Sequence, residues 1–83
     1  MLSTGNQLKA ARALAGMDQA AVAEGAGVNV NTIRNMEAKG QGTLTSGMDV
    51  VRKVQRVLET AGIEFLNDGR PGVRLKEPRA EDE

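Results

Sequence analysis

The chain has 83 residues, with no cysteine and no histidine, and its 11 Lys and Arg residues balance 11 Asp and Glu residues. A chain of this length forms one domain with a small core, and without thiols or imidazoles we expect no disulfide, no metal site and no cofactor. Its apolar runs are only a few residues long, too short for a transmembrane helix or a signal peptide, so we expect a cytoplasmic protein with no membrane partner.

Charge is unevenly distributed along the chain. Up to Leu66 there are seven basic and six acidic residues, whereas the remainder has four basic and five acidic residues and ends in three acids. The acidic end therefore offsets a slightly basic body. With a single Phe, the chain offers no aromatic platform for single-stranded nucleic acid, so duplex DNA is the better candidate for a nucleic-acid ligand.

The first helix is predicted to begin at Gln7. From there Leu8, Ala11 and Leu14 recur at helical spacing, and Gly16 ends the pattern as a C-terminal cap would. This spacing predicts about three turns of amphipathic helix.

Two further short helices are predicted before residue 40. Asp18 is the expected N-cap of a second helix over residues 19–25, and Asn29 is the expected N-cap of a third over residues 30–39 that ends at Gly40. The apolar residues that share a face of these helices, and are expected in the core, are Val22, Ala23, Ala26, Ile33 and Met36.

A fourth helix is predicted after the loop 40–43. Ser46 is its expected N-cap, and Gly62 is expected to end it in a left-handed conformation. Its apolar stripe consists of Met48, Val51, Val54, Val57, Leu58 and Ala61.

After Gly62 the pattern changes to short β-prone runs. Residues 63–66 and 73–76 alternate in character, and residues 67–72 between them favour a turn, so a β-hairpin is expected over 63–76. The helical part, residues 1–62, is then the main domain, and residues 77–83 are expected to form a charged, flexible tail.

Residues 19–36 carry the most specific pattern in the chain, QAAVAEGAGVNVNTIRNM. Ala23 is small enough to let two helices approach closely, and Gly27 suits a left-handed turn between them. In these features the chain resembles the Xre family, the Cro and phage-repressor type of helix-turn-helix protein. The segments AGIEF (61–65) and PGVRL (71–75) are also similar to the ends of small Xre-type regulators.

This resemblance implies a mainly α fold, a repressor-like helix-turn-helix bundle of four to five short helices with a C-terminal β-hairpin. It implies a sequence-specific regulator of transcription that binds double-stranded DNA, in a bacterial cytoplasm at the nucleoid, and it suggests a role in phage or mobile-element control. The third helix, with Val30 to Glu37 as its recognition segment, would enter the major groove.

Four residues on the exposed side of that helix are the candidates for reading bases. Asn pairs with adenine and Arg with guanine through two hydrogen bonds, whereas Val offers only apolar contact to a thymine methyl. Family members often carry a polar residue at the position of Val30. The four candidates are Val30, Asn31, Arg34 and Asn35.

Other residues are expected to contact phosphates or to support the fold. Gln19 resembles the family's phosphate-contacting glutamine at the start of the second helix. Arg12 and Glu37 match an arginine and a glutamate that form a partly buried ion pair in repressor-like members. The remaining phosphate candidates, in the third helix and the loop after it, are Thr32, Lys39, Gln41 and Thr43.

The chain is expected to bind an inverted repeat as a homodimer, because one small module covers too little DNA for useful specificity. Pairing of two hairpins would protect their edges, and packing of the hairpin on the chain's own fourth helix is the competing explanation. The residues expected in a hairpin interface are Ile63, Phe65, Leu66, Val73 and Leu75.

Two other interpretations concern partner proteins and catalysis. The alternative to a regulator is the antitoxin of a toxin–antitoxin pair, which binds a partner protein, although only about seven residues follow the hairpin. Arg52, Lys53 and Arg56 form a basic run that suits a solvated face better than DNA contact. Asp49 and Glu59 lie on the same helix without a nucleophile or metal ligand beside them, so an enzyme is not expected.

Overall fold

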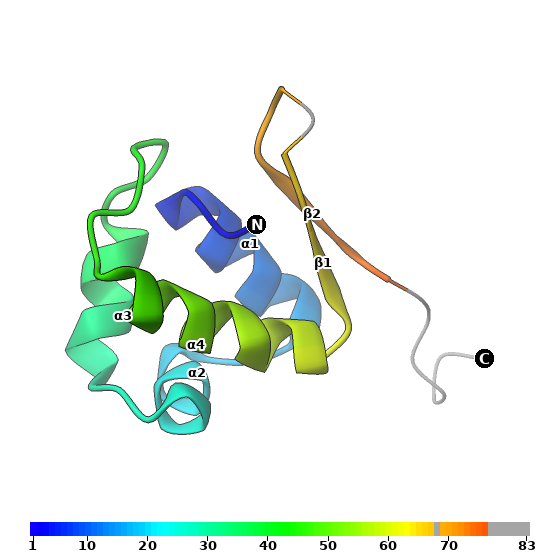
Figure 1. Cartoon of the computed structure of the whole chain (residues 1–83). Coiled ribbons are helices and arrows are strands. Elements are labelled where there is room, and N and C mark those ends of the chain that lie inside the picture. The colour runs from blue at the N-terminus through cyan, green and yellow to red at the C-terminus, as the bar shows by residue number, and fades with distance from the viewer. Residues whose placement is uncertain (68, 77–83) are drawn as a thin grey trace.

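The computed structural model describes residues 1–67 and 69–76, and within them four helices precede a two-stranded hairpin (Figure 1). The predicted mainly α fold with a C-terminal hairpin is confirmed, with four helices rather than five. The elements are α1 (Gly5–Ala15), α2 (Gln19–Ala26), α3 (Val30–Glu37), α4 (Met48–Thr60), β1 (Ile63–Leu66) and β2 (Gly72–Leu75).

Helix α1 begins two residues earlier than the apolar spacing predicted, because Thr4 caps it. The Thr4 hydroxyl accepts a hydrogen bond from the backbone N–H of Gln7, and the Gln7 side chain accepts one from the N–H of Thr4, which completes a capping box. Gly16 ends the helix in the left-handed conformation, as expected.

Helices α2 and α3 form the expected helix-turn-helix. Asp18 and Asn29 cap them through their side chains, and Gly27 adopts the predicted left-handed conformation between them, with φ 68°. Helix α3 ends at Glu37, two residues before the predicted end. The chain tightens there because the N–H groups of residues 39 and 40 bond to carbonyls three residues back rather than four.

Helix α4 differs from the sequence expectation at its start. Its N-cap is Gly47, not Ser46, and no side chain bonds to its first N–H groups. Consequently Met48, predicted in the buried stripe, lies at the first helical position with 61% of its surface exposed. Val51, Val54 and Leu58 are buried as predicted.

One core lies between the helices and continues under the hairpin. All five apolar residues predicted to be buried in α2 and α3 are buried, and Leu8 and Ala11 of α1 meet them from the other side. Leu14 lies mostly outside this core, with 39% of its surface exposed.

The hairpin pairs Ile63 with Leu75 and Phe65 with Val73 in antiparallel register. These four side chains share one face of the hairpin, because alternate residues of a strand point the same way. That face packs on the chain's own α1 and α4. The predicted strand 73–76 is shifted by one residue in the structure, to Gly72–Leu75.

Within the part of the chain that the structure describes, no helix is long and apolar enough to cross a membrane. The same residues hold no cluster of acidic side chains that could bind a metal ion. The expected flexible tail, residues 77–83, lies outside the described residues.

Candidate nucleic-acid interface

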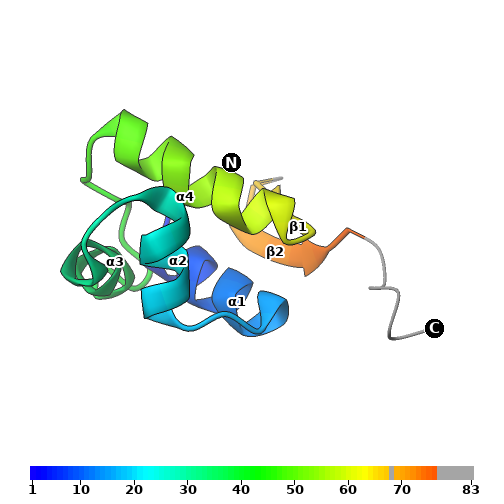
Figure 2. The same cartoon turned by 90° about the horizontal axis from the view of Figure 1, so that it is seen from below.

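Helix α3 lies at one edge of the molecule (Figure 2), with a polar face toward solvent and an apolar face toward the core. Ile33 and Met36 are buried, whereas Asn31, Arg34 and Asn35 are exposed. The split follows from helical periodicity, since residues three or four apart share a face. The three exposed residues can form hydrogen bonds with both base edges and phosphates.

Val30 is only half-exposed, because it packs against the rim of the core at the first position of α3. Part of its side chain supports the core, so Val30 has less exposed surface for DNA contact than Asn31, Arg34 and Asn35. Thr32 is likewise half-buried.

Arg34 and Asn31 are joined by a hydrogen bond across one helical turn. The Arg34 guanidinium donates to the Asn31 side-chain oxygen at 3.0 Å. The Asn31 side-chain oxygen has two lone pairs, so it can accept a second bond from adenine while it orients Arg34. The backbone N–H of Asn31 is itself satisfied by the Asn29 cap at 2.8 Å.

The expected ion pair between Arg12 and Glu37 is present and carries two hydrogen bonds. The Arg12 Nε and Nη2 atoms donate to Glu37 Oε2 and Oε1 at 2.5 and 2.9 Å, and Nη1 donates to the carbonyl of Met17 at 3.1 Å. Hydrogen bonding to Glu37 raises the pKa of Arg12 above its ordinary value, against the opposing effect of burial. The guanidinium therefore remains charged.

Glu37 also holds the side chain of Gln19. The Gln19 amide donates to Glu37 Oε1 at 3.2 Å, so one carboxylate bridges α1, the start of α2 and the end of α3. Gln19 is half-buried, and its position at the first turn of α2 places backbone N–H groups beside it. The ion pair thus sets the position of a predicted phosphate contact as well as the packing.

The loop after α3 is held by the first turn of α1 and the segment before it. The N–H of Asn6 donates to the carbonyl of Gly40 at 2.8 Å, the N–H of Leu44 donates to the carbonyl of Ser3 at 2.9 Å, and Thr4 and Thr43 form an isolated β-bridge. The remaining candidates in this loop, Lys39, Gln41 and Thr43, have exposed side chains on a backbone that is fixed from behind.

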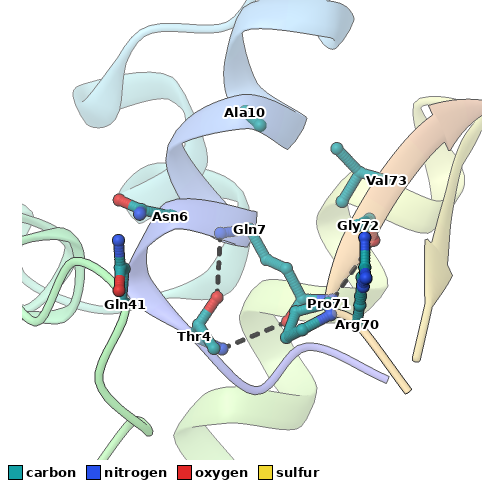
Figure 3. Close-up of a pocket in the computed structure, with 9 residues that line it drawn as sticks. All are labelled: Thr4, Asn6, Gln7, Ala10, Gln41, Arg70, Pro71, Gly72 and Val73. Atoms are coloured by element: carbon teal, nitrogen blue, oxygen red, sulfur yellow. Dashed lines mark hydrogen bonds between the residues drawn. The ribbon is translucent and has the colours of Figure 1, made fainter. Parts of the chain in front are cut away.

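Gln7 joins this segment to the hairpin and is 3% exposed. Its amide nitrogen donates to the Gly72 carbonyl at 3.2 Å, and its oxygen accepts from the N–H of Thr4 (Figure 3). The same nitrogen also donates to the Leu66 carbonyl at 3.4 Å, and the oxygen also accepts from the N–H of Ser3. Neither Gln7 nor Thr4 was among the residues singled out from the sequence. The pattern Thr4-x-x-Gln7 is a capping box and is the signal that identifies both.

A hollow of about 760 Å³ lies between α1, the loop after α3 and the hairpin turn. Figure 3 shows Asn6 and Gln41 on one side of it and Arg70 and Pro71 on the other. Gln7 lines the hollow, but its side chain already forms hydrogen bonds within the chain. The polar side chains left to contact a ligand are mainly those at the rim, such as Asn6, Gln41 and Arg70.

Four of the five residues expected in a hairpin dimer interface pack against the core of their own chain. Ile63 is 2% exposed, and Phe65, Val73 and Leu75 pack against the core. This face of the hairpin therefore packs on its own chain, as the competing explanation expected. It contacts α1 in addition to α4, the one helix named in that expectation. Leu66 lies on the other face, and there the Glu64–Arg74 ion pair bridges the strands.

Arg52, Lys53 and Arg56 are exposed on α4, and none of them forms a salt bridge with any other residue in the described ranges. Asp49 and Glu59 are also exposed. Neither belongs to a group of carboxylates that could hold a metal ion among the described residues.

Comparison with known proteins agrees with this geometry. A family model described as helix-turn-helix matches residues 8–60, from the first buried leucine of α1 to the last residue of α4. The matched residues include α2, α3 and the loop after them. No curated protein matches the chain.

Proposed function

The chain belongs to the Cro/C1-type, Xre-like helix-turn-helix family of DNA-binding regulatory domains, which is not a catalytic family, and we propose that it recognises a specific inverted-repeat operator as a homodimer. Helix α3 enters the major groove, with Asn31, Arg34 and Asn35 at base edges and Val30 beside a thymine methyl. The protein acts at the bacterial nucleoid in the cytoplasm.

The observation that carries this proposal is the two-sided character of α3. Ile33 and Met36 are buried where α3 packs on α1 and α2, and this packing leaves Asn31, Arg34 and Asn35 on the solvent side of the helix. Because the backbone of α3 is fixed by this packing, it presents the three polar side chains together on one face, as insertion into the major groove requires.

Phosphate contacts flank the helix on both sides in this proposal. Gln19 and Thr32 bind the backbone at one edge of the groove, and Lys39, Gln41 and Thr43 bind it at the other. Gln19 is oriented by Glu37, and the loop is fixed by the first turn of α1 and the segment before it. Such contacts set the register of the domain on the duplex without reading its sequence.

The test begins with selection from a randomised duplex library, because selection does not depend on a known operator. We expect an inverted repeat with half-sites one helical turn apart. Binding of the selected duplex is then titrated with the wild type and with an Asn31→Ala/Asn35→Ala variant. Each lost bidentate pair should weaken binding by about 1–3 kcal/mol.

The control is Thr60→Ala, an exposed residue at the C-terminal end of α4, which precedes the hairpin and is not among the proposed DNA contacts. It should bind as the wild type does. A folded wild type that enriches no sequence would contradict the proposal. Retention of a second protein from the native host would then favour the antitoxin alternative, in which partner binding is the main activity.

A further inference from the structure

A groove lies between α2 and α4, which pack on each other, and none of the candidate DNA contacts lines it. The groove encloses about 420 Å³, and its walls are mostly apolar. Gly25 lets the two helices come close here, because a Cβ at this position would lie 3.2 Å from both methyl carbons of Val57. The other residues that line the groove are Ala26, Lys53, Arg56 and Thr60.

Three exposed cations of α4 lie along this groove and the hollow next to it, and we call Arg52, Lys53 and Arg56 the α4 basic patch. Asp49 precedes the patch by one turn and Glu59 follows it, yet neither forms a salt bridge with the patch. Glu59 instead accepts a hydrogen bond from the Gln55 amide at 3.1 Å. A row of cations beside an apolar groove suits a segment that combines carboxylates with small apolar residues.

The chain itself carries a segment of this composition. Residues 77–83, outside the described ranges, have the sequence EPRAEDE, which we call the acidic segment. Its last three residues, Glu81, Asp82 and Glu83, are consecutive carboxylates that match the three cations of the α4 basic patch in number. Pro78 and Ala80 supply small apolar side chains before them.

The end of β2 places the acidic segment within reach of the α4 basic patch. The N–H of Lys76 donates to the carbonyl of Gly62 at 2.7 Å, and Gly62 lies two residues after the end of α4. The acidic segment therefore starts beside the C-terminal end of this helix. From Thr60 back to Arg52 the helix rises about 12 Å. Residues 77–83 can span up to about 25 Å, which is enough to reach all three cations.

We propose that the acidic segment docks on the α4 basic patch of its own chain, with Glu81, Asp82 and Glu83 against the three cations. A single exposed ion pair contributes little to stability, so the contact depends on several pairs that form together. The covalent connection through β2 also favours it, because a short tether gives an effective concentration in roughly the millimolar range. An acidic segment of another protein would need a comparable concentration to displace it.

Docking directs DNA toward α3, a consequence that rests on the proposed function. Phosphates bound at the α4 basic patch would compete with binding through α3, because no candidate base-reading residue lines the groove or the hollow beside it. Carboxylates on the patch remove this attraction. The exposed cations Arg34 and Lys39, in α3 and the loop after it, stay open to DNA.

Carbodiimide cross-linking of the intact chain without DNA tests the contact itself, because the reagent joins a carboxylate to a lysine amine that touches it. At low salt we expect a link within one chain from the acidic segment to Lys53, and none to Lys9 or Lys39. Lys53→Arg is the matched control, since it keeps the charge and removes the amine, and it should abolish the link. The link should also disappear at about 1 M salt, where the screening length is about 3 Å.

Two results of this experiment would overturn the proposal. One is a link from the acidic segment to Lys9 or Lys39 in place of Lys53. The other is a link to Lys53 that forms only between chains, which a mixture of isotopically labelled and unlabelled protein detects. Lys76 adjoins the acidic segment and serves as the positive control for reaction of its carboxylates.

A cycle of charge variants measures the consequence for DNA. Neutralising the three carboxylates in Glu81→Gln/Asp82→Asn/Glu83→Gln should raise affinity for duplex of random sequence by roughly threefold or more at low salt. The same change should have much less effect in a chain whose α4 basic patch is replaced by three glutamines. An equal rise in both backgrounds would show that the carboxylates repel DNA without docking, and would overturn the proposal.

The two experiments separate failure of the docking from failure of the proposed function. The cross-link to Lys53 needs no DNA, so it decides the contact even if the wild type selects no duplex sequence and the proposed function is wrong. If the wild type selects an operator but gives no link to Lys53, the docking is wrong while the DNA-binding function stands.

Discussion

The carboxylate of Glu37 receives two hydrogen bonds from Arg12 and a third from Gln19, and it therefore joins three helices at one point. The side chains of Arg12 and Glu37 are 17% and 7% exposed. A pair this poorly solvated stabilises the fold only while both partners remain, since either charge alone lacks compensation.

We expect Glu37→Ala to lower the free energy of unfolding by about 3 kcal/mol, because it leaves the Arg12 guanidinium partly buried without its carboxylate. Urea denaturation followed by circular dichroism measures this change. DNA affinity should fall further than folding alone explains, because Gln19 loses the acceptor that orients it.

The double variant Arg12→Met/Glu37→Met is the control for this prediction. It removes both charges and keeps apolar volume, so its loss of stability should be clearly smaller than that of Glu37→Ala. Equal losses in the two variants would show that the carboxylate does not compensate the guanidinium.

Gln7→Ala should reduce the free energy of unfolding by about 2 kcal/mol. The substitution removes the capping box of α1 and the hydrogen bonds from α1 to the hairpin carbonyls. Hydrogen exchange should show faster opening of β1 and β2 than in the wild type. Asn6→Ala, the neighbouring exposed position, should change stability by less than about 0.5 kcal/mol.

Gly5→Ala is expected to destabilise the protein by about 2 kcal/mol or more, because the new methyl would meet backbone atoms rather than flexible side chains. A Cβ at Gly5 would lie 2.5 Å from the Met36 carbonyl oxygen and 2.8 Å from the Gly40 nitrogen. Thermal unfolding gives the comparison. Gly72→Ala, where a Cβ would meet nothing within 4 Å, should be nearly neutral.

Lys39→Ala should weaken binding to all DNA sequences alike. One lost phosphate contact should reduce the slope of log K against log salt by about 0.9. Lys76→Ala, an exposed lysine beyond β2, removes the same charge at a distance from α3 and should leave the slope unchanged. Equal slopes for Lys39→Ala and the wild type would remove Lys39 from the interface.

The helix-turn-helix could be predicted from the amino-acid sequence, because the signals for it are local. Asp18 and Asn29 each cap the residues that directly follow, Gly27 suits a left-handed turn wherever it stands, and the spacing of Ile33 and Met36 decides which face of α3 is buried. The same periodicity predicts which residues of α3 lie on its exposed polar face, so the candidate base-reading residues could also be predicted from the sequence.

The surroundings of the hairpin and of the start of α4 could be known only from the folded chain. The alternation of apolar residues in each strand, Ile63 with Phe65 and Val73 with Leu75, predicts an apolar face but does not say what covers it. In the folded chain that face packs on α1 and α4. Met48 follows the helical pattern, yet α4 begins at that residue, and most of its surface stays exposed. Periodicity fixes which side chains share a face, whereas burial depends on contacts between segments distant in the sequence.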